Sequence, residues 1–169
     1  ANRLRRICDT GRVSSTVIAA IPWFPGAYRH AAHAMPAERN FGMDVFHPRY
    51  LQLPGIGMRI QPDSLAATIL DELARHKLGA DAFDVVDAHY FYPDGVAAAR
   101  VAEALRLPLV ISARGSDINL IGDIAFARRR MLRAASRAQA LVAVSGALAK
   151  KMTDLGMPVA RIHVLRNGV

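Results

Sequence analysis

The sequence predicts an α/β fold with a mostly parallel sheet, and three observations support that prediction. The segment 83–117 has the pattern of a complete strand, helix and strand. Short apolar runs alternate with amphipathic helical stretches over the rest of the chain. Polar residues gather directly after the apolar runs of the central segment. Because successive strands joined by a helix lie parallel, this order of elements indicates one parallel α/β unit.

The first third of the chain carries two of the predicted strands. It begins in a helix, and the β-branched run 17–21 follows as a strand. Two prolines and a glycine then predict a loop over 22–26, which carries Trp23. The segment 27–40 has mixed signals and is expected to be long and partly irregular. The second strand is expected over 42–50.

The later elements have clearer boundaries. Pro62 and the polar residues after it are expected to start a helix. A basic helix over 123–137 leads into an apolar strand over 140–144. Ser145 is placed to cap the next helix, and 161–165 is expected to be the last strand.

The central unit places its polar residues where strands end. The strand 84–88, bounded by Asp, is expected to be covered on both faces and to deliver His89 and Tyr90 to its carboxyl end. The strand 109–112 leads into the turn 114–117, where a Gly-Ser pair is expected to bring backbone N–H groups close to a ligand. Ligands of open α/β sheets bind at these strand ends, so His89 and 114–117 are the first candidates for function.

Composition limits the class of protein. The 169 residues fit a single domain, 1–169, and the lone Cys8 excludes an internal disulfide, which agrees with a reducing compartment. No apolar run approaches the roughly 20 residues of a spanning helix. The net charge of +8 favours anionic partners: nucleic acid, a phospholipid surface or a phosphorylated substrate.

Several familiar motifs fail on inspection. Gly55 and Gly57 lack the third glycine and the strand-to-helix setting of a dinucleotide fingerprint. Ser145 lacks the flanking glycines of a nucleophile elbow. His30 and His33 have no further ligands nearby, so no metal site is predicted.

Four segments together carry a resemblance to a known family. They are IPWFP at 21–25, FDVVDAHYFYPDG at 83–95, LVISARGSD at 109–117 and the tail 140–169. In their order and spacing they resemble the amino-terminal domain of family-4 (group 1) retaining glycosyltransferases. Such enzymes have two Rossmann-like domains that face each other across a cleft, and the amino-terminal one mainly receives the acceptor.

The resemblance implies a Rossmann-like, three-layer α/β/α fold whose first strand is missing here, and it implies that the donor-binding domain is absent. It also implies a sugar transferred with retention from a nucleotide-sugar to a glycan or lipid-linked acceptor, in polysaccharide biosynthesis. Neither a cofactor nor a metal is expected, because the nucleotide-sugar is a co-substrate. The fragment alone is expected to be inactive. The resemblance implies His89 as the catalytic residue and the following as substrate-binding residues: Trp23, Tyr90, Arg114, Gly115, Ser116 and Asp117.

Alternatives remain at each point. His89 could merely end a strand, Arg114 could be a surface cation, and Trp23 could be a packing residue. The protein could be a non-enzymatic basic module that binds nucleic acid, although aromatics interleaved with basic residues are missing, or a fragment of a related nucleotide-sugar epimerase.

One helix carries a run of arginines whose role is also open. Arg128, Arg129, Arg130 and Arg133 could form a solvated helix face or could rest on anionic lipid. A cytoplasmic protein, with possible peripheral contact at the inner face of the membrane and no nucleic-acid partner, is the expectation under the family resemblance.

Overall fold

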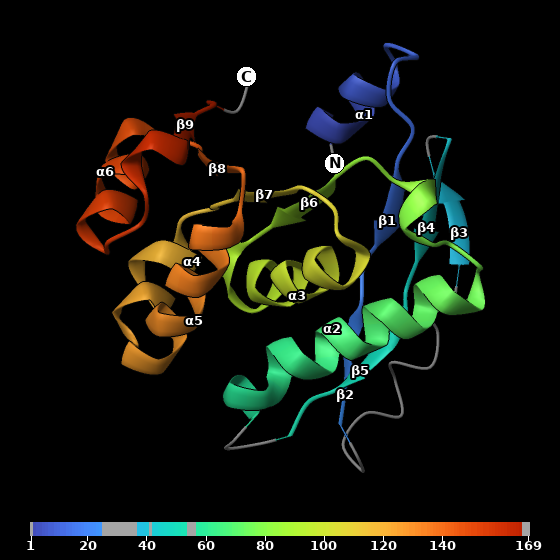
Figure 1. Ribbon diagram of the computed structural model, residues 1–169, viewed down its shortest axis with the longest axis horizontal. Coiled ribbons are helices and arrows are strands. Elements are labelled where there is room, and N and C mark those ends of the chain that lie inside the picture. Colours follow the sequence, from blue (N-terminus) through green and yellow to red (C-terminus); the bar gives the residue numbers. More distant parts are fainter. Residues whose placement is uncertain (1, 25–36, 41, 54–56, 167–169) are drawn as a thin grey trace.

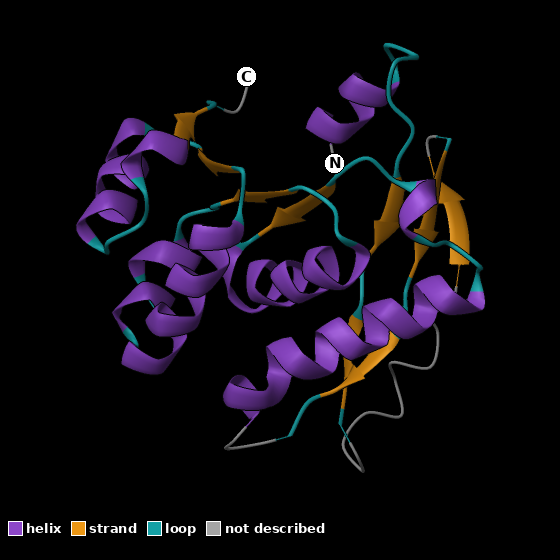
Figure 2. Ribbon diagram, in the orientation of Figure 1, coloured by secondary structure: helices purple, strands orange, loops and turns teal. Residues whose placement is uncertain are grey.

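The computed structural model describes residues 2–24, 37–40, 42–53 and 57–166. Its strands form a mostly parallel set, with α2, α3 and α5 on one side of them and α1 on the other (Figures 1 and 2). The predicted α/β class with a mostly parallel sheet is therefore confirmed. His30 and His33 lie outside the described residues.

The two early strands form a long parallel pair. β1 (Thr16–Ile18) pairs with β4 (Met43–Phe46), and β2 (Ile21–Trp23) pairs with β5 (Arg49–Leu51). Both ladders keep the same offset, since Thr16 faces Asp44 and Ile21 faces Arg49. The strand therefore continues through Pro22 to Trp23, and the predicted loop over 22–26 was wrong for its first residues. Pairing with a second strand outweighed the local proline signal.

A short strand appears where an irregular segment was expected. β3 (Ala37–Asn40) runs antiparallel to β4 and pairs with it from Ala37 opposite Phe46 to Asn40 opposite Met43. Gly42 follows with φ of +78°, a value that favours glycine in the turn between them. Because the pairing partner lies further along the chain, the segment 37–40 alone gave little indication of it.

The four later strands form one parallel sheet. Its order is β6 (Val86–His89), β7 (Leu109–Ser112), β8 (Ala140–Ala143) and β9 (Ile162–Val164). Among the described residues, β6 pairs only with β7 and β1 only with β4. Within the described residues no strand pairing therefore joins the early strands to the later ones. Since β6 is an edge strand, Val85 before it is 48% exposed, and the expectation that 84–88 is covered on both faces was wrong.

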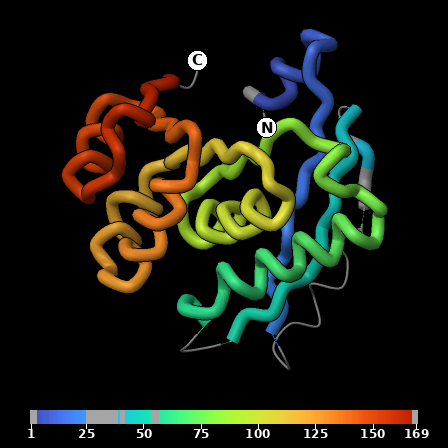
Figure 3. The backbone as a smooth tube through the Cα atoms, in the orientation of Figure 1, coloured from blue at the N-terminus to red at the C-terminus, as the bar shows by residue number. Residues whose placement is uncertain are grey.

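From α2 onward the helices connect successive strands, as Figure 3 shows along the chain, whereas α1 precedes the first strand. Their bounds are α1 (Asn2–Cys8), α2 (Gly57–Arg75), α3 (Val96–Leu105), α4 (Ser116–Asn119), α5 (Ala125–Arg137) and α6 (Gly146–Asp154). The predicted capping role of Ser145 is confirmed, because its hydroxyl oxygen accepts a hydrogen bond from the Leu148 amide at 3.2 Å.

Helix α2 begins five residues before the predicted start at Pro62. A proline inside a helix has no N–H to donate to the carbonyl four residues back, which is that of Met58. That carbonyl instead accepts a hydrogen bond from the Tyr92 hydroxyl, and the neighbouring Arg59 carbonyl accepts one from Arg130 at 2.5 Å. The proline thus leaves one free acceptor, the Met58 carbonyl, and both carbonyls tie α2 to the rest of the fold.

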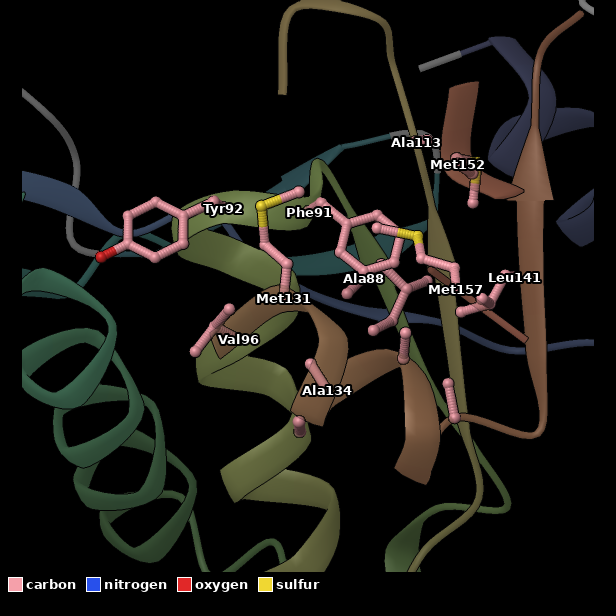
Figure 4. Packing of buried hydrophobic residues seen from close by; sticks show 14 of the residues in the cluster. Ala88, Phe91, Tyr92, Val96, Ala113, Met131, Ala134, Leu141, Met152 and Met157 are labelled. Atoms are coloured by element: carbon pink, nitrogen blue, oxygen red, sulfur yellow. The ribbon is translucent and has the colours of Figure 1, made fainter. Parts of the chain in front are cut away.

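The main core lies between the four-stranded sheet and its helices. Phe91, Met131, Leu141 and Met152 are completely buried in it, and Figure 4 shows their side chains within one cluster. A second, smaller core joins α2 to α3 and β5. The turn after β6 is part of the main core through Phe91 and Tyr92, which fixes the position of the strand end.

The turn after β6 depends on a glycine. A Cβ added at Gly95 would lie 2.9 Å from Ile111 Cγ2 and 3.3 Å from the Tyr90 carbonyl oxygen. We expect Gly95→Ala to lower the free energy of unfolding by about 1–3 kcal/mol, the usual cost of overpacking. Denaturant unfolding measures this value. Gly146→Ala, where no atom lies within 4 Å, is the control, and an equal loss in both variants would contradict the prediction.

Candidate functional site

Histidine 89 lies at the carboxyl end of β6 between two charged side chains. Its Nε2 is 3.2 Å from an Asp87 carboxylate oxygen, and its Nδ1 is hydrogen bonded to the Arg114 guanidinium. A guanidinium can only donate, so Nδ1 must accept. The other ring nitrogen, Nε2, faces the Asp87 carboxylate. Asp87, His89 and Arg114 therefore form one chain of polar contacts across β6 and the turn after β7.

The Asp117 carboxylate joins the turns after β6 and β7. It is completely buried and accepts hydrogen bonds from the backbone amides of Phe91 at 2.7 Å, Gly115 at 2.8 Å and Arg114 at 3.1 Å. Of the Gly115-Ser116 pair, whose N–H groups were expected close to a ligand, the Gly115 amide is thus used within the protein, as is the amide of Arg114. The geometry gives Asp117 a positioning role, because it holds Arg114 beside His89.

Tyrosine 90 adds a second link between the same turns. Its hydroxyl lies 2.7 Å from the Ser116 hydroxyl, and its amide donates to the Ser112 carbonyl at 2.9 Å. Its φ of +86° is a strained value for a bulky residue and costs on the order of 1–3 kcal/mol. The surrounding hydrogen bonds must offset that cost. Strain of this kind is found most often at functional sites.

We call this group the strand-end cluster: Asp87, His89, Tyr90, Arg114, Gly115, Ser116 and Asp117. It brings together six of the seven residues that the sequence singled out. Trp23, the seventh, lies in β2, is 41% exposed and is not joined to the cluster by any contact described in the structure. Figure 1 shows β2 beyond α2, away from the end of β6.

Asp87 is the one residue of the strand-end cluster that the sequence motifs did not identify. Asp87 lies two residues before His89, and alternate residues of a strand share a face. The two side chains therefore meet without any turn between them. If the strand had been predicted to have one exposed face, the alternation of side chains along it would have placed Asp87 on the same face as His89.

Two ionisable groups near the cluster have shifted pKa values. Burial raises the pKa of the Asp94 carboxyl, and the charge of Asp117 raises it further, whereas a hydrogen bond from its own backbone opposes the shift. Because the ionised form is disfavoured in the fold, Asp94 lowers the stability of the fold as the pH rises from the ordinary pKa of an aspartate toward its raised pKa in the fold. Burial also raises the pKa of the Tyr92 hydroxyl, so it stays protonated and donates to Met58.

The arginines of α5 differ in their surroundings. Arg128, Arg129 and Arg133 are exposed, whereas Arg130 is bound to the Asp63 carboxylate of α2. Within the described ranges no three His, Cys, Asp or Glu side chains gather as metal ligands would. In the same ranges, no helix has the length and apolar character needed to cross a membrane.

The family model for Glycosyltransferase Family 4 matches residues 16–169. The match covers most of the chain, so the protein belongs to this family, and it corresponds to the amino-terminal domain of the two-domain GT-B type. This assignment favours the transferase prediction over the nucleic-acid-binding and epimerase alternatives.

Particular relatives agree with the family. The chain is 31% identical over 132 residues to a Bacillus subtilis (strain 168) protein named as a teichuronic acid biosynthesis glycosyltransferase, TuaC, covering 75% of this chain and 33% of that one. The fold of this chain is similar to that of Anabaena HepE solved with UDP-glucose, with a TM-score of 0.53 and 18% identity. The match covers 73% of this chain and 30% of HepE. For HepE solved with UDP and glucose the TM-score is 0.54 at 19% identity, and the match covers 74% of this chain and 32% of that one. The chain spans about a third of the length of these relatives.

Proposed function

We propose that the protein is the acceptor-side half of an enzyme that transfers a sugar from a nucleotide-sugar to a glycan or lipid-linked acceptor, with retention of anomeric configuration. Family membership supports the reaction class. The names of the relatives support a UDP-sugar donor and a polysaccharide product, since HepE was solved with UDP-glucose and TuaC is named for teichuronic acid biosynthesis.

The observation that carries the proposal is the chain of Asp87, His89 and Arg114 at the carboxyl ends of β6 and β7. Asp87 lies beside Nε2 of His89, and Nδ1 is the nitrogen that accepts from Arg114. Arg114 uses one of its five N–H donors on that nitrogen and keeps the others for an anionic group. When Arg114 turns to a phosphate or carboxylate, His89 Nδ1 is free to accept a sugar hydroxyl.

Under this proposal the catalytic role of His89 is positioning and electrostatic support in the transition state. The departing phosphate takes the acceptor proton in a retaining transfer of this kind. Arg114, Tyr90 and Ser116 bind substrate, Gly115 lets the turn approach it, and Asp117 fixes the turn. Trp23 contributes only as a more distant wall of the acceptor site.

The proposal also includes a location. A cytoplasmic enzyme that uses a lipid-linked acceptor would work at the inner face of the membrane, and Arg128, Arg129 and Arg133 are exposed for contact with anionic lipid. Arg130 is less available for contact with lipid, because its guanidinium is bound to Asp63 and to the Arg59 carbonyl.

A transfer assay tests the function. A chain long enough to include the donor-binding half is incubated with UDP-glucose and other nucleotide-sugars in the presence of excess chelator, and the anomeric configuration of the product is followed by NMR. We expect transfer with retention, no dependence on added metal, and no transfer by the 169-residue chain alone. An inverted product, or activity that only magnesium or manganese restores, would overturn the corresponding part of the proposal.

A further inference from the structure

A groove of about 560 Å³ lies between α3 and α5. Its floor is formed by the small and apolar side chains of Val96, Ala99 and Ala134. Its walls carry charge and polar groups, contributed by Arg100, Glu103, Arg130, Arg133, Ser136 and Arg137. A second hollow of about 250 Å³ continues it and adds Arg106. We call the two together the arginine groove. It shares no residue with the strand-end cluster.

The charges of the arginine groove do not balance. In its larger part, four arginines face one acidic residue, Glu103. Asp63, outside the lining, pairs with two of these arginines at once, Arg100 at 2.9 Å and Arg130. Four guanidiniums against two carboxylates leave a net charge of +2 in the larger part, and Arg106 adds a further positive charge in the smaller part.

The positions of the guanidiniums are partly fixed. Asp63 holds Arg100 and Arg130 from the α2 side, and the Arg59 carbonyl holds Arg130 further, so that its side chain is only 22% exposed. Glu103 holds Arg137 from α3. The structure describes no such partner for the side chain of Arg133, which is exposed at the wall. Three arginines are thus oriented before any ligand arrives, and one stays available.

We propose that the arginine groove binds a phosphate or diphosphate group, at a site separate from the strand-end cluster. Planar guanidiniums bind phosphate oxygens with two parallel hydrogen bonds, and oriented arginines lose less conformational entropy when they do so. A volume of this size accommodates a diphosphate with its substituent. A concave site also suits a discrete anionic group better than a flat lipid surface. The group could belong to a soluble molecule or to a lipid headgroup.

Calorimetric titration of the protein with inorganic diphosphate tests the site. We expect saturable binding that Arg133→Gln weakens roughly ten-fold, the effect of losing one charged bidentate partner. Arg133 is exposed and structurally unengaged, so the variant should fold normally. Arg12→Gln, an equal change of charge at an exposed position after α1, is the control and should bind as the parent does.

A second variant should change the affinity for diphosphate in the opposite direction. Glu103→Gln removes the carboxylate that lines the groove and releases Arg137, so diphosphate should bind several-fold more tightly. The ion pair of Glu103 with Arg137 is exposed, and its loss should leave stability almost unchanged. Unchanged or weaker binding by Glu103→Gln would overturn the proposal. So would an equal loss in Arg133→Gln and Arg12→Gln, because it would show attraction by net charge alone.

Co-sedimentation with phosphatidylcholine vesicles that contain phosphatidylglycerol separates the two sources of phosphate. Binding that diphosphate displaces, and that follows the same order of variants, supports a lipid headgroup. Diphosphate binding without vesicle binding supports a soluble ligand. The absence of saturable binding to both probes would reject the site.

Discussion

Replacing His89 by alanine should lower the turnover of an enzyme that contains both halves by about 100-fold, the usual loss for one well-placed polar group in a transition state. The reason is its position at the end of β6, where the Asp87 carboxylate lies beside one ring nitrogen and the Arg114 guanidinium is hydrogen bonded to the other. His89→Gln, which keeps an acceptor near the same place, should recover part of the rate. The measurement is steady-state sugar transfer with far-UV circular dichroism as the test of folding.

The choice of a control histidine depends on the structure. His76, at the end of α2, is no neutral position, because its ring stacks on Phe46 with centroids 4.1 Å apart and its Nε2 lies 3.2 Å from Glu72. His163, exposed in β9, is the better control, and His163→Ala should keep parental turnover. If His89→Ala also keeps it, His89 only ends a strand, and the assignment of Arg114 and Ser116 to substrate loses its main support.

Replacing Asp117 by alanine should lower the free energy of unfolding by about 3–5 kcal/mol, because three backbone amides lose their buried acceptor at once. Asp117→Asn keeps the size and one acceptor oxygen, so its loss should be smaller, about 1–3 kcal/mol. Denaturant unfolding gives both values, and the asparagine variant remains measurable if the alanine variant does not fold.

The matched control is another aspartate in the segment that follows. Asp123 forms an exposed ion pair with Lys151 at 3.1 Å, and pairs of this kind contribute less than about 1 kcal/mol. Asp123→Ala should therefore unfold almost as the parent does. Similar losses in Asp117→Ala and Asp123→Ala would show that the three amide hydrogen bonds do not hold the turns together.

The two large predictions address different functions of one cluster. His89 acts on the ligand, so its loss should appear in turnover with little change in stability. Asp117 acts on the protein, so its loss should appear in stability first, and in turnover only because Arg114 leaves its position beside His89. A comparison of the two variants therefore separates catalysis from positioning.

Local patterns predicted the later half of the fold well. The strand 109–112 was predicted with its observed bounds, and the cap at Ser145 was predicted with its mechanism. These features depend on neighbouring residues only: an apolar run before a turn, or a hydroxyl three residues before a free amide. The early half was predicted less well, because β2 and β3 exist through pairing with strands further along the chain.

The sequence by itself determined the α/β class, the order of strands and helices, and the placement of His89 and 114–117 at strand ends, because hydrophobic periodicity and strand direction are local properties. Only the tertiary structure decided that Asp87 and Arg114 occupy both ring nitrogens of His89, and that Asp117 turns inward to three amides. It alone also placed the arginines of α3 and α5 around one groove. Each of these outcomes depends on which elements pack against each other, and that choice is made by core burial over the whole chain.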